Sequence, residues 1–242
     1  RAFRKRIISY QDGLGELPAH LASALGHRLH LNSSLQSIRR DGSHWQLTIG
    51  GQLESFDQLV LTAPAHAPGC LPLPADLLDR LSALRKIDYP PVSVLSLGFR
   101  RSEVRHPLDG FGALVPECEQ EAILGVLFPS SVFPGRAPKE EVLLTAFVGG
   151  ERQPELASAD REALIQTVLP ALRRLLGIEG EPSFIHHRFW PQAIPQYKLG
   201  YGAILEEIEA IETDWPGLHL AGNYRGGISL TYCIENAMTA AG

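Results

Sequence analysis

The chain has 242 residues, 44% hydrophobic and 20% charged, a composition ordinary for a globular protein with one large core or two smaller ones. Its 22 Lys and Arg residues against 27 Asp and Glu give a net charge of −5. Because the basic residues are scattered along the chain, a nucleic-acid surface is disfavoured. No apolar run approaches the roughly eighteen residues that a membrane span needs.

The first quarter of the chain predicts a short helix followed by a small antiparallel sheet. Apolar residues recur at helical spacing over 16–25, and Gly26 follows as a stop signal. Strand pieces are predicted over 28–31 and 34–39. Turn dipeptides at 41–42 and 50–51 then connect two further strands in a meander. These later strands are predicted over 44–49 and 52–56.

Two short apolar runs, over 58–62 and 217–221, resemble each other. The first is closed by Ala63-Pro64 and fits a strand buried on both faces, as in a covered parallel sheet. Four prolines within 64–74 indicate a boundary or crossover. We therefore expect both runs to lie in one sheet, with the block between them forming an inserted domain.

That inserted block predicts helices at its two ends and strands between them. Leucines at helical spacing follow residue 75, and a helix with Ser158 as candidate N-cap is predicted to end at Gly177. A proline-rich loop spans 133–139. The predicted strands cover 92–99, 111–115, 122–128 and 142–148.

The stretch from Leu220 to Ser229 predicts a buried strand, a glycine pair and the start of a helix over 230–241. A helix N-terminus presents unpaired backbone amides to an anion or a flavin ring edge, and Ser229 can cap it. The glycines let the backbone approach a ligand closely. An ordinary strand-turn-helix has the same pattern, and no Gly-x-Gly-x-x-Gly occurs in the chain.

Three cysteines, Cys70, Cys118 and Cys233, are far apart and lack any Cys-x-x-Cys spacing. This favours small buried thiols in a reducing compartment, hence a cytoplasmic location without a zinc site. The adjacent His186 and His187 do not change this, because neighbours on a strand point to opposite faces and cannot chelate one ion. No metal is predicted.

Several sequence blocks follow one another as in the flavin-dependent protoporphyrinogen oxidases, which the chain resembles over nearly its whole length. They are Asp12-Gly-Leu-Gly-Glu-Leu-Pro18, Leu61-Thr-Ala-Pro-Ala-His66, Gly110-Phe-Gly-Ala-Leu-Val-Pro116, Leu124-Gly-Val-Leu-Phe128, Phe133-Pro-Gly-Arg-Ala-Pro138, Thr145-Ala-Phe-Val-Gly-Gly150, Ala193-Ile-Pro-Gln-Tyr197 and Pro216-Gly-Leu-His-Leu-Ala-Gly-Asn223. The resemblance implies FAD as cofactor, protoporphyrinogen IX or coproporphyrinogen III as substrate, and O2 as electron acceptor in haem biosynthesis.

The resemblance also implies an α/β and α+β fold. A partial FAD-binding domain of the glutathione-reductase type would comprise segments 1–74 and 188–242, and a mainly antiparallel substrate-binding domain would span 75–187. The segment carrying the dinucleotide fingerprint, and a membrane-associating domain, are expected outside these residues. We therefore expect exposed apolar surface where they would pack. Peripheral contact with the inner membrane face and a homodimer are further expectations.

The resemblance transfers site roles to apolar and backbone positions rather than to catalytic side chains. The substrate slot would be lined by Leu114, Leu127 and Phe147. The flavin would contact Leu35, Trp190, Gly222, Asn223, Gly227, Ile228, Ser229 and Leu230. Tyr232 stands where the family often has Asp, which weakens side-chain roles there. Arg100, Arg101, Arg105 and Arg136 are candidates for the substrate carboxylates, and none is assigned.

Two other functions remain open at this point. A related amine oxidase or carotenoid desaturase shares the strand-glycine-helix ending but lacks several of the quoted blocks. Alternatively, the 242 residues form a truncated, non-catalytic porphyrin-binding module. The isolated chain is expected to retain little FAD, because the fingerprint that holds the pyrophosphate is not in it.

Overall fold

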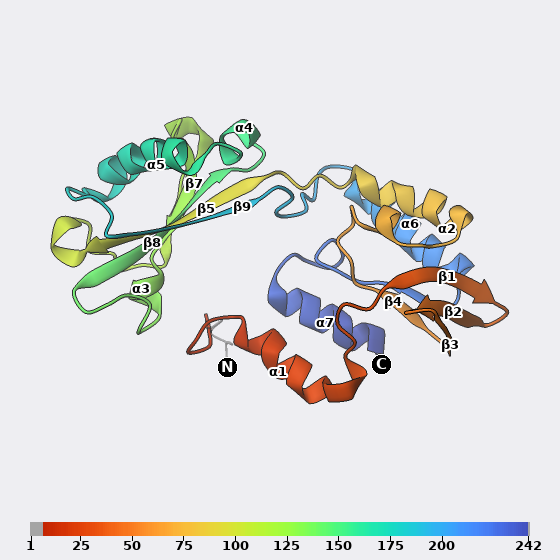
Figure 1. Cartoon of the computed structure of the whole chain (residues 1–242). Coiled ribbons are helices and arrows are strands. Elements are labelled where there is room, and N and C mark those ends of the chain that lie inside the picture. Colours follow the sequence, from red (N-terminus) through yellow and green to blue (C-terminus); the bar gives the residue numbers. More distant parts are fainter. Residues whose placement is uncertain (1–6, 242) are drawn as a thin grey trace, which may run out of the picture. The chain divides into compact units, whose positions relative to one another are not determined.

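The structure is a computed structural model that describes residues 7–241 (Figure 1). The chain divides into two compact units. Unit 1 comprises residues 1–29 and 90–193, and unit 2 comprises residues 30–89 and 194–242. None of the helices in the described part of the chain combines the length and hydrophobicity that a membrane crossing requires.

Unit 1 is built on a five-stranded antiparallel sheet in the order β6-β7-β8-β5-β9. The strands are β5 (Val92–Arg100), β6 (Gly112–Leu114), β7 (Ile123–Leu127), β8 (Glu141–Gly149) and β9 (Phe184–Trp190). The helices of this unit are α1 (Glu16–Leu25), α3 (Pro129–Val132), α4 (Pro154–Ala157) and α5 (Arg161–Leu176). The predicted antiparallel substrate-domain sheet is thus present.

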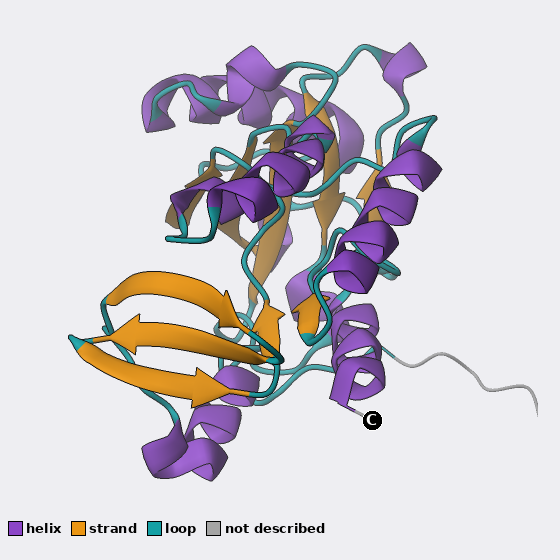
Figure 2. Ribbon diagram, turned by 90° about the vertical axis from the view of Figure 1, so that its right-hand side faces the viewer, coloured by secondary structure: helices purple, strands orange, loops and turns teal. Residues whose placement is uncertain are grey.

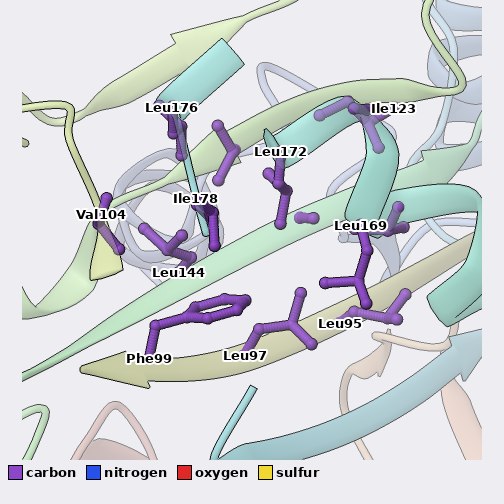
Figure 3. Packing of buried hydrophobic residues seen from close by; sticks show 14 of the residues in the cluster. Leu95, Leu97, Phe99, Val104, Ile123, Leu144, Leu169, Leu172, Leu176 and Ile178 are labelled. Atoms are coloured by element: carbon purple, nitrogen blue, oxygen red, sulfur yellow. The ribbon is translucent and has the colours of Figure 1, made fainter. Parts of the chain in front are cut away.

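One face of this sheet packs against α5 (Figure 3). Side chains alternate along a strand, so β5 directs Leu95, Leu97 and Phe99 to the helix, and all three are fully buried. Leu169 and Leu172 of α5 fill the space above them. This cluster forms the hydrophobic core of unit 1.

The N-terminus of α5 differs from its prediction. The N-cap is Asp160, whose carboxylate accepts a hydrogen bond from the Ala163 amide at 2.8 Å. The prediction that Ser158 is the N-cap is therefore wrong. The Ser158 hydroxyl instead donates to the Glu155 carbonyl at the end of α4. A carboxylate also complements the positive end of the helix dipole, which explains why Asp160 takes this position. The helix ends as predicted at Gly177, which has φ +61°.

Unit 2 contains the predicted meander and a two-stranded parallel sheet. The meander strands are β1 (Leu35–Asp41), β2 (His44–Ile49) and β3 (Gln52–Phe56), seen at the lower left of Figure 2. The parallel pair is β4 (Leu59–Leu61) and β10 (Leu218–Leu220). The helices are α2 (Ala75–Leu81), α6 (Tyr201–Asp214) and α7 (Leu230–Ala241). The expectation that the two similar apolar runs share a sheet is confirmed.

The core of unit 2 joins these elements through large side chains. Trp45 of β2 is fully buried and stacks on Trp215 with ring centroids 5.9 Å apart. Leu77 of α2 and Ile208 and Ile211 of α6 belong to the same buried cluster. The meander, the parallel pair and both helices therefore share one core.

Several local predictions are wrong. Residues 28–31 form no strand, because a 3-10 turn at Gly26–Arg28 leads into an exposed turn. Val60 of β4 is 46% exposed, so this strand is not buried on both faces. Cys70 and Cys118 are exposed rather than buried. Helix α6 is absent from the predictions above, although its isoleucines recur at helical spacing.

The compact units divide the chain at other positions than the predicted domains. Residues 75–89 lie in unit 2 because α2 packs its leucines into that core. Residues up to 29 lie in unit 1, where the Arg136 guanidinium donates to the Tyr10 carbonyl at 2.6 Å. Residues 188–193 also lie in unit 1, since β9 continues to Trp190.

Candidate functional site

The loop of residues 221–229 connects β10 to α7 in unit 2 and contains most of the predicted flavin contacts. The Ala221 amide donates to the Leu61 carbonyl, which extends the parallel pairing by one bond. Gly226 and Gly227 have φ values of +73° and +134°, conformations that side-chain-bearing residues rarely adopt. Ser229 caps α7 as predicted, since its hydroxyl accepts from the Tyr232 amide at 3.3 Å. The predicted strand-glycine-helix ending is present, with the strand closing at Leu220.

Tyrosine hydroxyls hold this loop in place. The Tyr197 hydroxyl donates to the Asn223 carbonyl at 2.8 Å and accepts from the Gly227 amide at 3.2 Å. Tyr89 donates to the Asn223 side-chain oxygen at 3.4 Å. Burial raises the pKa of Tyr197 above its ordinary value, so the phenol stays protonated and can donate. The Tyr197 side chain thus links Asn223 and Gly227, two residues of the loop that the sequence resemblance assigns to the flavin.

A charged pair fixes the start of the same loop to α6. The Glu212 carboxylate accepts from the Leu220 amide at 2.8 Å and from the Arg225 guanidinium at 2.6 Å. Arg225 also donates to the Leu220 carbonyl. Since both residues are more than half buried, this network holds the end of β10 in a defined orientation.

The N-terminus of α7 fits a flavin ring edge. The first-turn amides of a helix have no acceptor within the helix and carry its positive dipole end. Ile228 and Leu230 are 48% and 49% exposed, so apolar side chains flank these donors at the surface. Neutral donors beside apolar groups match the heteroatoms and flat carbon skeleton of the isoalloxazine. The residues present therefore fit the cofactor that the sequence implies.

Two predicted flavin residues lie away from this loop in the sequence. Leu35 is the first residue of β1 and is half-buried against the unit 2 core. Trp190 ends β9 in unit 1 and is 46% exposed. Unit 2 therefore holds Leu35 together with the loop residues, and Trp190 lies in the other unit.

The predicted substrate residues share the second face of the unit 1 sheet, opposite α5, which we call the outer face. Strand register aligns Leu114, Gly125 and Phe147 in one row across β6, β7 and β8. Leu127 lies in the adjacent row, two residues along β7. Leu114 is 87% exposed. The structure thus brings all three predicted slot residues onto one face.

Gly125 lies between Leu114 and Phe147 in this row of the sheet. A Cβ atom at this position would lie 2.7 Å from the Ala113 carbonyl oxygen, closer than van der Waals contact allows. The missing side chain therefore lets β6 pack closely on β7, and Gly125 itself is buried, with Leu114 Cδ2 3.3 Å from the same point. Sequence alone assigns this glycine no role.

The arginines proposed for carboxylate binding are differently engaged. Arg101 and Arg136 donate to backbone carbonyls, and Arg105 pairs with Glu179. Arg100 is the exposed last residue of β5. No assignment to a substrate carboxylate follows from these contacts.

His187 lies on the α5 side of β9 and forms a buried hydrogen-bond chain. The Ser93 hydroxyl donates to the Ala157 carbonyl at 2.6 Å, so it must accept from His187 Nε2, which is 2.8 Å away. Desolvation lowers the pKa of His187, and the nearby charges of His186 and Arg161 lower it further. The folded state therefore favours the neutral imidazole.

The lowered pKa of His187 predicts that the stability of the folded state depends on pH. Because the pKa of His187 is lower in the folded state than its ordinary value of 6.5, the unfolded state takes up a proton at this residue at a higher pH than the folded state does. The stabilising contribution of neutral His187 is therefore fully present above pH 6.5 and is lost as the pH falls below that value. His187→Gln can still donate to Ser93 but does not titrate. We expect thermal melts of the wild type to lose more stability below pH 6.5 than those of the variant, and equal slopes would contradict the assignment.

Tyr197→Phe tests the role of the phenol. The variant leaves Asn223 and Gly227 without their shared partner, and we expect flavin to bind the whole protein about fivefold to tenfold more weakly. Flavin titration of the apoprotein measures this, with Tyr10→Phe in unit 1 as the control. An unchanged dissociation constant in Tyr197→Phe would show that the phenol does not position the loop.

A family model described as flavin containing amine oxidoreductase matches residues 2–242. A curated relative, protoporphyrinogen oxidase 2, chloroplastic/mitochondrial, of Arabidopsis thaliana is 37% identical over 249 residues, covering 97% of this chain and 49% of the relative. Coproporphyrinogen III oxidase of Bacillus subtilis (strain 168) is 25% identical, covering 88% and 45%. The chain thus spans about half the length of the curated relatives it matches.

A solved structure has the same fold over nearly the whole chain. It is the crystal structure of a protein from Exiguobacterium sp. 255-15, named as a protoporphyrinogen oxidase. The TM-score is 0.79 at 25% identity, with 96% of this chain and 51% of the other covered. The predicted fold class, a partial FAD-binding fold with an inserted antiparallel sheet, is confirmed.

Proposed function

This chain belongs to the flavin containing amine oxidoreductase family, and from that premise we propose that the whole protein is an FAD-dependent oxidase. Its proposed reaction is the oxidation of protoporphyrinogen IX to the porphyrin, with O2 as electron acceptor, in haem biosynthesis. FAD follows from the family and from the solved relative. Coproporphyrinogen III is the second candidate substrate, favoured by the relative from Bacillus subtilis.

The main structural support for this proposal is the outer face of the unit 1 sheet. A porphyrinogen is a broad apolar ring system, and Leu114, Leu127 and Phe147 offer apolar side chains on one face of the sheet. Dispersion and burial of apolar area would bind the rings there. We assign unit 1 to the substrate and unit 2, with its 221–229 loop, to the flavin.

The residues of this chain would bind and orient the flavin and the substrate rather than transfer protons. When bound, FAD supplies the two-electron oxidation chemistry. The amides of Ile228 and Leu230 at the start of α7 would orient the ring edge. Tyr197 would hold the preceding loop in place through Asn223 and Gly227. The outer face would exclude water from the substrate rings. We assign no catalytic acid or base, because a proton released from the oxidised substrate can pass to solvent.

Location and assembly are further parts of the proposal. We place the protein in the cytoplasm, with peripheral contact to the inner membrane face, and as a homodimer, following the family resemblance. Exposed apolar side chains on α7, among them Ile234 and Met238, support packing of this helix against further protein. Fractionation and gel filtration of the whole protein test these points.

Turnover by the purified whole protein tests the function. We expect a yellow protein that generates porphyrin fluorescence from protoporphyrinogen IX and consumes O2 in proportion. Faster turnover of coproporphyrinogen III would select the second substrate. A colourless protein, or one that oxidises primary amines and neither porphyrinogen, would contradict the proposal.

A further inference from the structure

Arg188 lies on the outer face beside the predicted substrate residues. It pairs with Val94 of β5, which pairs in turn with Phe147 of β8. Arg188 and Phe147 therefore occupy the same row, two strand spacings or about 10 Å apart. His187 points to the opposite face, toward Ser93, which agrees with the outward direction of Arg188.

The Arg188 guanidinium lies over the ring of Trp190 on this face. The guanidinium carbon lies 4.8 Å from the Trp190 ring centroid, and the two residues alternate on β9, so both project from the same side. A guanidinium that contacts an aromatic ring keeps its N–H groups available as hydrogen-bond donors to another group. Trp190 thus pre-orders the side chain without occupying its hydrogen-bond donors.

Arg188 has no acidic partner among residues 7–241. Arg105, Arg173 and Arg174 of the same unit each pair with a glutamate, whereas the printed contact of Arg188 is the indole ring. A solvent-exposed, pre-ordered cation beside an apolar slot is suited to an anionic group on an apolar ligand.

We propose that Arg188 binds a carboxylate of the substrate and so discriminates acidic porphyrinogens from neutral ones. This inference rests on the proposed function. A tetrapyrrole ring lying over Phe147 would extend a carboxyethyl group across Val94 toward Arg188. The guanidinium fork would then donate two parallel hydrogen bonds to the carboxylate. Arg188 is a specificity-determining residue in this account and takes no part in the oxidation.

Arg188→Leu in the whole protein tests this assignment with two substrates, the porphyrinogen diacid and its dimethyl ester. We expect KM for the diacid to rise about tenfold or more, the loss of one charge-assisted contact, with kcat unchanged. KM for the ester should not change. Arg188→Lys keeps the charge without the fork and should give an intermediate KM. Arg161→Leu, an exposed arginine on the α5 side, removes the same charge and should behave as wild type.

A direct binding measurement separates this inference from the function it rests on. Titration with the oxidised porphyrin diacid, followed by fluorescence, should give a dissociation constant about tenfold weaker in Arg188→Leu, and the dimethyl ester should bind both proteins alike. Equal diacid binding by both proteins would overturn the role of Arg188 even if wild-type turnover upheld the function. A wild type without turnover that still showed the diacid difference would refute the function alone. Failure to bind either porphyrin would contradict both.

Discussion

Gly227→Val is expected to strip most of the flavin from the whole protein. Gly227 has φ +134°, and a Cβ atom there would collide with the Tyr232 ring. Forcing a β-branched residue into this conformation costs about 1–3 kcal/mol. We expect the loop to relieve this strain by moving its Gly227 amide away from Tyr197, which displaces the start of α7. Flavin binding should weaken by roughly tenfold to a hundredfold, seen as a fall in the flavin-to-protein absorbance ratio after gel filtration.

Gly51→Val is the matched control for backbone strain. Gly51 also has a positive φ, +83°, in the turn between β2 and β3, but a Cβ atom there meets no neighbour within 4 Å. This variant should lose some stability and keep its flavin. Equal flavin contents in Gly227→Val and the wild type would show that the 221–229 loop does not bind the cofactor.

Leu114→Asp is expected to lower kcat/KM for protoporphyrinogen IX by at least about thirtyfold, mainly through KM. The substitution removes an apolar contact of about 2 kcal/mol and places a carboxylate beside an acidic, apolar substrate. Because Leu114 is 87% exposed, the free energy of unfolding should change by less than about 0.5 kcal/mol. Steady-state kinetics and a thermal melt together measure both effects.

Leu53→Asp provides the same chemical change on an exposed strand of unit 2, where Leu53 is 66% exposed. Its kinetics should match those of the wild type. If Leu114→Asp also retained full kcat/KM while folding normally, the outer face of the sheet would not be the substrate surface.

The elements that the sequence predicts best are those specified by neighbouring residues. The turn at Gly42, the helix stop at Gly177 and the Ser229 cap each depend on a few local torsions or bonds, and each occurs where the pattern indicates. The predicted N-cap of α5 is wrong because Ser158 and Asp160 are both residues that cap helices well. Local chemistry cannot choose between two adequate candidates, whereas the three-dimensional packing of α4 and α5 does.

The parts of the site that the sequence could not predict depend on pairings between distant segments. Tyr197 lies 26 residues before Asn223, and no local pattern shows that its hydroxyl reaches both ends of the loop. Arg188 joins the row of Phe147 only because β5 lies between β8 and β9. Strand order and register decide which side chains share a face, and these follow from the fold.

Anaerobic mixing of the whole protein with protoporphyrinogen IX tests the central claim most directly. We predict that the visible flavin absorbance is lost as the porphyrinogen is oxidised, and that porphyrin fluorescence reaches its full value only when O2 is admitted and the flavin absorbance returns, because each porphyrin requires three successive two-electron oxidations. A flavin spectrum that is unchanged by porphyrinogens but is lost on addition of a primary amine would contradict the account.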